Sequence, residues 1–114
     1  MNRILLGIAA SLVAIGAAMA HSKSEKTVPA DGATVAGVER IEIAFDAPMR
    51  VTSIKLLRDE REIAVERETG LEPVKAFLAS PADALQPGAY RVEWRGLSDD
   101  GHPMQGSFGF TVAK

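Results

Sequence analysis

The chain has 114 residues, no cysteine, and 13 Lys and Arg against 15 Asp and Glu. This length suits one small domain. A net charge of −2 argues against a stripe of basic residues that would bind nucleic acid and against a polybasic patch that would bind anionic lipid. The absence of cysteine excludes disulfides and thiolate metal sites, so any metal must be held by nitrogen, oxygen or thioether ligands.

The first twenty residues have the pattern of a cleavable secretory signal peptide. Arg3 gives the positive start, residues 4–20 are apolar and uncharged, and Ala-Met-Ala at 18–20 ends the run with small residues. A membrane anchor is the alternative, although the run is short for a span and rich in Gly and Ala. Cleavage after residue 20 predicts a single exported domain, residues 21–114, of net charge −3 because one of the 13 basic residues is lost.

The exported part alternates apolar and polar residues with a period of two, which predicts half-buried antiparallel strands. Strands are expected at residues 38–45, 52–58, 61–67, 74–79, 89–96 and 106–113. The core-facing positions of the three clearest runs are Ile41, Ile43, Phe45, Tyr90, Val92, Trp94, Phe108, Phe110 and Val112.

Turn-forming residues separate these runs, among them Asp46-Ala47-Pro48, Asp59-Glu60 and Asp99-Asp100-Gly101, and residues 66–70 are the one candidate for a brief helix. The charged residues Lys23, Glu25 and Lys26 are expected to form a solvated strand edge. Short strands punctuated in this way are typical of a β-sandwich or small barrel. The predicted fold class is therefore all-β, with about seven short antiparallel strands.

The two histidines stand where each can bind a metal. Asp100-Gly101-His102 places a carboxylate and an imidazole two residues apart, on the same side of an extended segment. An ordinary surface turn is the alternative, because Asp-Gly is common in turns. Cleavage after residue 20 would make His21 the first residue and free its backbone amine to chelate a metal together with its ring. The alternative here is that the peptidase leaves whichever residue happens to follow its site.

His21, Asp100 and His102 together offer three nitrogens and one carboxylate oxygen. Cu(II) favours four such ligands in a near-planar arrangement, whereas zinc prefers a tetrahedron and binds the same set more weakly. The amine must lose its proton to bind, so affinity should fall below its ordinary pKa of about 7.7–8.0. A cut after residue 18 would instead give Met-Ala-His, which chelates Cu(II) through backbone amides.

Three stretches of the exported part form a distinctive set: PADGATV at 29–35, IEIAFDAPM at 41–49 and LQPGAYRVEWRGLSDDGHPMQGSFGFTV at 85–112. With the histidine at 21, they resemble the CopC family of periplasmic copper-resistance proteins over nearly the whole exported chain. The resemblance implies a Greek-key β-barrel or sandwich. It also implies one Cu(II) held by the His21 amine and imidazole, Asp100 (with Asp99 as its neighbour) and His102. A copper-carrying role in the periplasm, often beside a CopD-type inner-membrane protein, is implied as well.

Some CopC proteins carry a methionine-rich segment that binds Cu(I). Here the exported part has only Met49 and Met104, far apart in sequence, and they are expected to fill gaps in the core or at its rim. The sequence therefore predicts a carrier of Cu(II) alone, without a separate Cu(I) site.

Three other functions are alternatives to a copper carrier: a copper monooxygenase, a metal-independent binding module and a hydrolase. Lytic polysaccharide monooxygenases also bind copper through an N-terminal histidine, but they need an open position for oxygen and a broad polymer-binding face. A metal-independent β-sandwich that binds another protein is a further alternative, since fold does not fix function. Hydrolysis has no support, because no serine stands in a nucleophile motif and there is no cysteine. We expect a non-enzymatic monomer, given the charged surface without patches.

Overall fold

The computed structural model describes residues 24–114, and within them every regular element is a strand. The signal peptide, the predicted cleavage site and His21 lie outside the described residues. No helix of residues 24–114 is long and apolar enough to cross a membrane. The strands are β1 (Ser24–Val28), β2 (Ala33–Val35), β3 (Ile41–Arg58), β4 (Arg61–Ile63), β5 (Val65–Arg67), β6 (Val74–Pro81), β7 (Gly88–Ser98) and β8 (Pro103–Val112).

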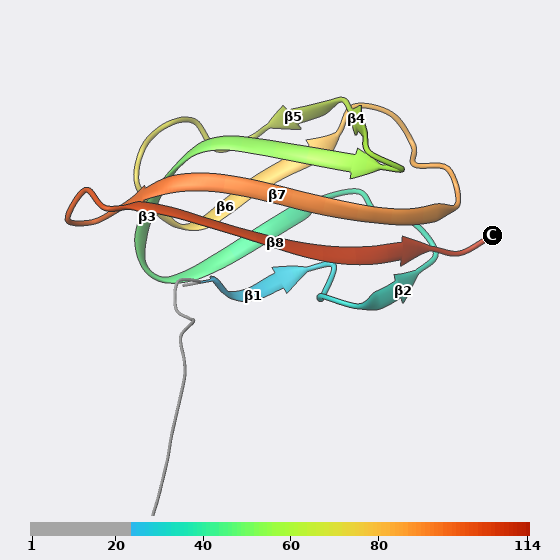
Figure 1. Ribbon diagram of the computed structural model, residues 1–114, viewed down its shortest axis with the longest axis horizontal. Helices are drawn as coiled ribbons and strands as arrows, with labels where there is room; N and C mark the ends of the chain where they lie inside the picture. Colours follow the sequence, from blue (N-terminus) through green and yellow to red (C-terminus); the bar gives the residue numbers. More distant parts are fainter. Residues whose placement is uncertain (1–23) are drawn as a thin grey trace, which may run out of the picture.

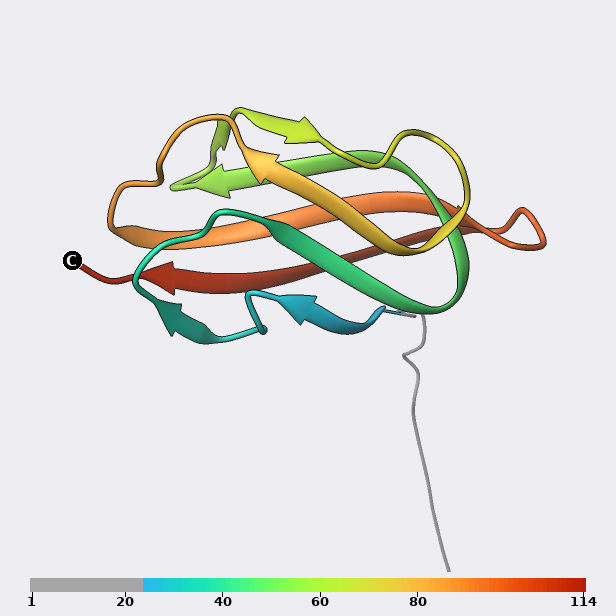
Figure 2. The ribbon, with the colours of Figure 1, turned by 180° about the vertical axis from the view of Figure 1, so that it is seen from behind.

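The long strand β3 bends and joins the two layers of the fold. Its first half, up to Phe45, pairs with β1 on one side and with β6 on the other. Its second half, from Met49 onward, pairs with β7 and β4. Figures 1 and 2 show β3 turning back on itself at the end of the molecule where the β7–β8 hairpin also turns. One strand thus serves both layers, and the result is a β-barrel-like fold.

The predicted core is confirmed by burial. Each of the nine residues assigned to the core from the alternation is at most 5% exposed in the structure. The Asp59-Glu60 turn is confirmed too, because both residues have positive φ, 53° and 66°, between the paired residues Arg58 and Arg61. Two adjacent positive φ values suit the twist of a tight hairpin.

The predicted all-β fold is confirmed, and one strand direction and several strand bounds need correction. Residues 24–114 form eight strands, close to the seven or so predicted, and β2 pairs with β8 in parallel instead of antiparallel. The runs at 38–45 and 52–58 are parts of one continuous strand, whereas the run at 61–67 is divided into β4 and β5. β1 and β2 are only five and three residues long, too short for alternation to reveal them.

The brief helix at residues 66–70 was a wrong prediction, because Glu66 and Arg67 belong to β5 and the side chain of Arg67 holds residues 68–70 in an irregular loop. Its guanidinium donates to the carbonyls of Val51 at 2.6 Å and Gly70 at 2.7 Å. The same group lies over the ring of Phe77, 5.0 Å from its centroid. These tertiary contacts outweigh the weak local preference for a helical turn.

Trp94 is the largest fully buried side chain of the core. Its ring meets Phe45 edge-on, with centroids 5.1 Å apart. Its cross-strand neighbour is Gly106, where an added Cβ would lie 2.8 Å from the indole nitrogen. Gly106 is therefore required so that the indole can lie flat against β8, which explains the pairing of a tryptophan with a glycine in this hairpin.

Candidate metal centre

The β7–β8 hairpin carries two of the predicted ligands at its tip. The two strands pair along their whole length, and Leu97 opposite Pro103 is the last pair before the turn. The turn is closed by backbone hydrogen bonds from Ser98 N–H to the His102 carbonyl, 2.9 Å, and from Gly101 N–H to the Ser98 carbonyl, 2.8 Å. Gly101 has a φ of 86°, a conformation that glycine adopts without strain.

The side chain of Ser98 organises this turn. Its hydroxyl oxygen accepts a hydrogen bond from the His102 backbone N–H at 3.1 Å and donates one to Asp100 Oδ1. Through these side-chain hydrogen bonds and the backbone hydrogen bonds of the turn, Ser98 fixes Asp100 and His102 relative to each other. This role of Ser98 was not foreseen, because a serine two positions before an Asp-Gly pair gives no signal of its own in the sequence.

Asp100 and His102 contact each other, although residues 99–101 form a turn and not the extended segment that was expected. His102 Nδ1 lies 2.9 Å from Asp100 Oδ1, and the two side chains are 74% and 70% exposed. The hydrogen bond from Ser98, followed by that from His102, lowers the pKa of Asp100 from 3.8 to about 2. The carboxylate is thus ionised throughout the neutral pH range, and Nε2 is the ring nitrogen of His102 that does not face Asp100.

This contact also constrains how the pair can bind a metal. Because Asp100 Oδ1 faces Nδ1, a single ion can be bound by the carboxylate and by Nε2 only if one side chain turns. Both are exposed enough to do so. If neither turns, Asp100 orients the imidazole from behind, as carboxylates commonly do for metal-binding histidines.

A hollow beside the hairpin tip joins these residues to the bend of β3. Its lining residues are Asp46, Ala47, Pro48, Met49, Ser98, Asp99, Asp100, His102 and Met104. Asp46 was read from the sequence only as part of a turn, and it is the bend of β3 that turns it towards the hairpin. The hollow combines carboxylates, an imidazole and two thioethers, which are all groups able to bind copper.

The chain enters the fold at this same end. Ser24, the first described residue, lies opposite Phe45, the neighbour of Asp46. In Figures 1 and 2, β1 starts near the bend of β3, towards the end where the β7–β8 hairpin turns. His21 is three residues before Ser24 in sequence. Residues 24–114 by themselves hold no cluster of three His, Cys, Asp or Glu side chains that could bind a metal ion.

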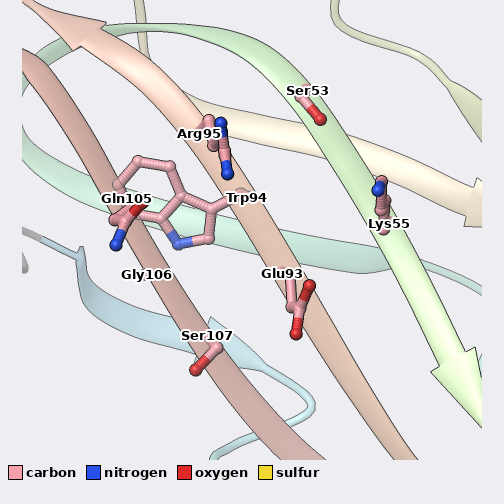
Figure 3. Close-up of a pocket in the computed structure, with 8 residues that line it drawn as sticks. All are labelled: Ser53, Lys55, Glu93, Trp94, Arg95, Gln105, Gly106 and Ser107. Atoms are coloured by element: carbon pink, nitrogen blue, oxygen red, sulfur yellow. The ribbon is translucent and has the colours of Figure 1, made fainter. Parts of the chain in front are cut away.

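A second depression lies on the outer face of β3, β7 and β8. Figure 3 shows its polar side chains around the buried indole of Trp94, namely Ser53, Lys55, Glu93, Arg95, Gln105 and Ser107. Glu93 is the only carboxylate of its lining, which includes no imidazole and no thioether. The hollow at the hairpin tip is therefore the better candidate for a metal centre.

Comparison with known proteins agrees with the fold and points to one family. The family model of the CopC domain matches residues 24–113. The chain is 31% identical to Copper resistance protein C of Escherichia coli, an alignment that covers 96% of this chain and 90% of that protein. It is 29% identical to Copper resistance protein C of Pseudomonas syringae pv. tomato, over 91% of this chain and 90% of that protein.

Solved structures show the same likeness. PcoC, a methionine-rich copper resistance protein from Escherichia coli, is matched at a TM-score of 0.66 and 31% identity, over 82% of this chain and 99% of that one. CopC from Methylosinus trichosporium OB3b is matched at a TM-score of 0.70 over 82% of this chain and 94% of that one. Because the sequence identity of this second match is 23%, it supports the fold alone.

Proposed function

The chain belongs to the CopC family of non-enzymatic copper proteins, and from this premise we propose that it carries one Cu(II) ion in the periplasm. The proposed ligands are the backbone amine and imidazole of His21, the carboxylate of Asp100 and the imidazole of His102. Signal-peptide cleavage after residue 20 would create the amine ligand. The site would then be complete only in the exported protein, residues 21–114.

The observation that carries the proposal is the placement of the Asp100–His102 pair at the end of the fold where β1 begins. Ser24 pairs with Phe45, and Asp46 lines the same hollow as Asp100 and His102. Three extended residues span at most roughly 10 Å, which is the reach available to His21 from Ser24. This reach supports a site formed by two segments that are about eighty residues apart in sequence.

The chemistry of the donors supports Cu(II). Three nitrogens and one carboxylate oxygen are ligands that Cu(II) binds in a tetragonal arrangement, and Cu(II) has the highest affinity among the divalent first-row metals. Asp100 contributes its negative charge at neutral pH, since its pKa is about 2. Binding would release the protons of the amine and of any charged imidazole, so Cu(II) affinity should rise with pH.

The exposure of the pair supports a carrier rather than an enzyme or a buried store. Asp100 and His102 lie at the tip of a hairpin with most of their side-chain surface in water, where a partner can reach a bound ion. Tyr90 and Trp94 are buried, at 5% and 2% exposure, and thus offer no aromatic platform for a polysaccharide. We infer that copper passes to or from a CopD-type inner-membrane protein and that the carrier itself is a monomer.

A Cu(II) titration followed by EPR tests the proposal. The protein with His21 as its first residue should bind one Cu(II) tightly and give a tetragonal signal with three nitrogen ligands and one oxygen. The matched control is acetylated at the His21 amine, which keeps both imidazoles and Asp100 but removes the terminal amine as a ligand. Its Cu(II) affinity should fall by roughly tenfold or more.

Each other outcome has a clear meaning. Equal affinity in the two proteins would show that the amine is not a ligand and that cleavage does not create the site. Weak, non-stoichiometric binding in both would contradict the copper-carrier proposal and would favour the metal-independent interaction module.

A further inference from the structure

We propose that the depression on the outer face of β3, β7 and β8 binds a phosphate group through Lys55 and Arg95 and the uncharged polar side chains beside them. This inference goes beyond the proposed function and does not depend on it, because the depression shares no lining residue with the hollow at the hairpin tip. Figure 3 labels its six polar side chains, which form two rows across the three strands, Ser53–Arg95–Gln105 and Lys55–Glu93–Ser107.

A β-bulge in β3 lies at one end of the depression. The register between β3 and β7 shifts between Val51 and Ser53, so Thr52 is an extra residue in the ladder. The Thr52 hydroxyl donates to the Arg95 carbonyl at 3.3 Å. A bulge bends its strand and changes the direction of nearby side chains, and bulges are common next to functional sites. The outer face of the sheet is therefore locally irregular where Arg95 lies.

The only carboxylate in the depression is bound to a residue outside it. Lys55 and Glu93 are direct cross-strand neighbours, a position at which opposite charges commonly pair. Glu93 instead accepts a hydrogen bond from Arg91 Nε at 2.9 Å, and Arg91 also lies 3.8 Å from Glu60. Within residues 24–114, no carboxylate lies within 4.0 Å of the charged nitrogens of Lys55 or Arg95. The depression thus keeps two positive charges without a partner in the described chain.

The positions of the two cations suit one phosphate group. Lys55 and Arg95 are both exposed and are diagonal neighbours across β3 and β7, so their Cβ atoms lie roughly 7–8 Å apart. Both side chains are long enough to meet at a group between them. A phosphate monoester carries a charge of about −1.5 to −2 at pH 7, which two cations balance.

The uncharged side chains add hydrogen-bond donors around the cations. Within residues 24–114, the side chains of Ser53, Gln105 and Ser107 make no hydrogen bond to another group. Arginine presents a planar fork of donors that fits phosphate oxygens, and lysine adds a compact charge. A phosphate group offers three or more oxygens to these donors and a carboxylate only two, so phosphate uses more of them. Solubility explains exposed charges in general, but not why the single carboxylate is drawn away from both cations.

An NMR titration with inorganic phosphate tests the proposal. The ¹⁵N-labelled protein is titrated at constant ionic strength, with sodium chloride as the reference salt. The backbone amide signals of Arg95, Gln105 and Ser107 should shift together and reach saturation with phosphate. The same shifts with chloride alone would show a general response to salt and would overturn the proposal.

A matched pair of lysine variants separates the site from net charge. Lys55→Gln should weaken phosphate binding by roughly tenfold, because it removes a charge-assisted hydrogen bond. Lys75→Gln makes the same change at an exposed lysine of β6, which pairs with the first half of β3, and should leave the affinity within about twofold. Glu93→Gln should strengthen binding, since it removes the one negative charge in the lining. Equal losses in the two lysine variants would refute a defined site.

Vesicles distinguish a lipid headgroup from a free phosphate group. Binding to phosphatidylglycerol vesicles that is lost in Lys55→Gln but kept in Lys75→Gln would identify a lipid headgroup as the source. Shifts with inorganic phosphate but no vesicle binding would identify a free phosphate or a phosphate ester, and the absence of both responses would overturn the proposal. The Cu(II) affinity of Lys55→Gln, measured in phosphate-free buffer, should stay within about twofold, so this site and the Cu(II) carrier stand or fall separately.

Discussion

The middle of the β7–β8 hairpin and its tip are built in opposite ways. In the middle, Trp94 is buried against Phe45 and held flat over Gly106, with almost no contact with water. At the tip, Asp100 and His102 are largely exposed and are held by hydrogen bonds with Ser98 instead of by packing. One hairpin thus separates stability from the proposed binding site: apolar packing anchors the strands, and a few polar contacts arrange the proposed ligands at their end.

The largest expected effect lies in the middle of the hairpin. Trp94→Ala removes the largest fully buried side chain and should destabilise the fold by about 3–5 kcal/mol. Urea unfolding monitored by circular dichroism measures this loss. The Cu(II) affinity of the fraction that remains folded should change little. A loss of Cu(II) affinity in the folded protein would show that the middle and the tip are coupled.

His102→Gln is the matching change at the tip. The imidazole is 74% exposed, so the midpoint of urea unfolding should stay close to that of the unaltered protein. Cu(II) affinity, measured by competition with a chelator, should fall by roughly 100-fold, because a proposed direct ligand is lost. An unchanged affinity would remove His102 from the ligand set.

Ser98→Ala should have a smaller effect on binding. The variant keeps all proposed ligands but loses the hydroxyl that contacts both Asp100 and the backbone of His102. We expect a decrease in Cu(II) affinity of roughly tenfold, the lower end of what the loss of an outer-shell partner costs. Ser98→Thr retains the hydroxyl and should recover most of the affinity. Equal losses in the two variants would point to a steric cause.

The smallest expected change concerns the protonation of Asp100. Ser98→Ala removes the largest cause of its lowered pKa, so that pKa should rise from about 2 towards 3.8. NMR titration of the aspartate carboxyl carbons in the metal-free protein measures the shift. Both values lie below the neutral range, so the fall of Cu(II) affinity below pH of about 8 should come from the amine and imidazoles. A pKa that stays near 2 in the variant would show that His102 alone lowers it.

The alternation of residue types was a sound guide to the inner face of the strands and a poor one to how the strands connect. Trp94 and Phe45 were correctly assigned to the core, since burial on one face of a strand is a local property that recurs at every second residue. The passage of β3 through residues 46–50 was not foreseen, because Asp46-Ala47-Pro48 has the composition of a turn. Pairing at the two ends of this segment, of Phe45 with Ser24 and of Met49 with Val74 and Ser98, carries the strand through it.

In the candidate site, too, some features were predictable from the sequence and others were not. The closeness of Asp100 and His102 was predictable because two residues cannot separate them far, and the contact of 2.9 Å bears this out. The places of Asp46 and Met49 beside them were not predictable, because they depend on the bend of β3. The role of His21 as a ligand stays a prediction, since that residue lies outside the described chain.

By itself the sequence determined which faces of the strands are apolar, where the hairpin turns lie and which residues could serve as copper ligands. Each of these depends on neighbours within a few positions, where backbone geometry leaves little choice. The tertiary structure alone decided that β3 serves two layers, and hence that Met49 and Met104 line the same hollow as His102. Contacts between residues fifty or more positions apart follow from strand pairing and packing across the whole fold, which no local pattern encodes.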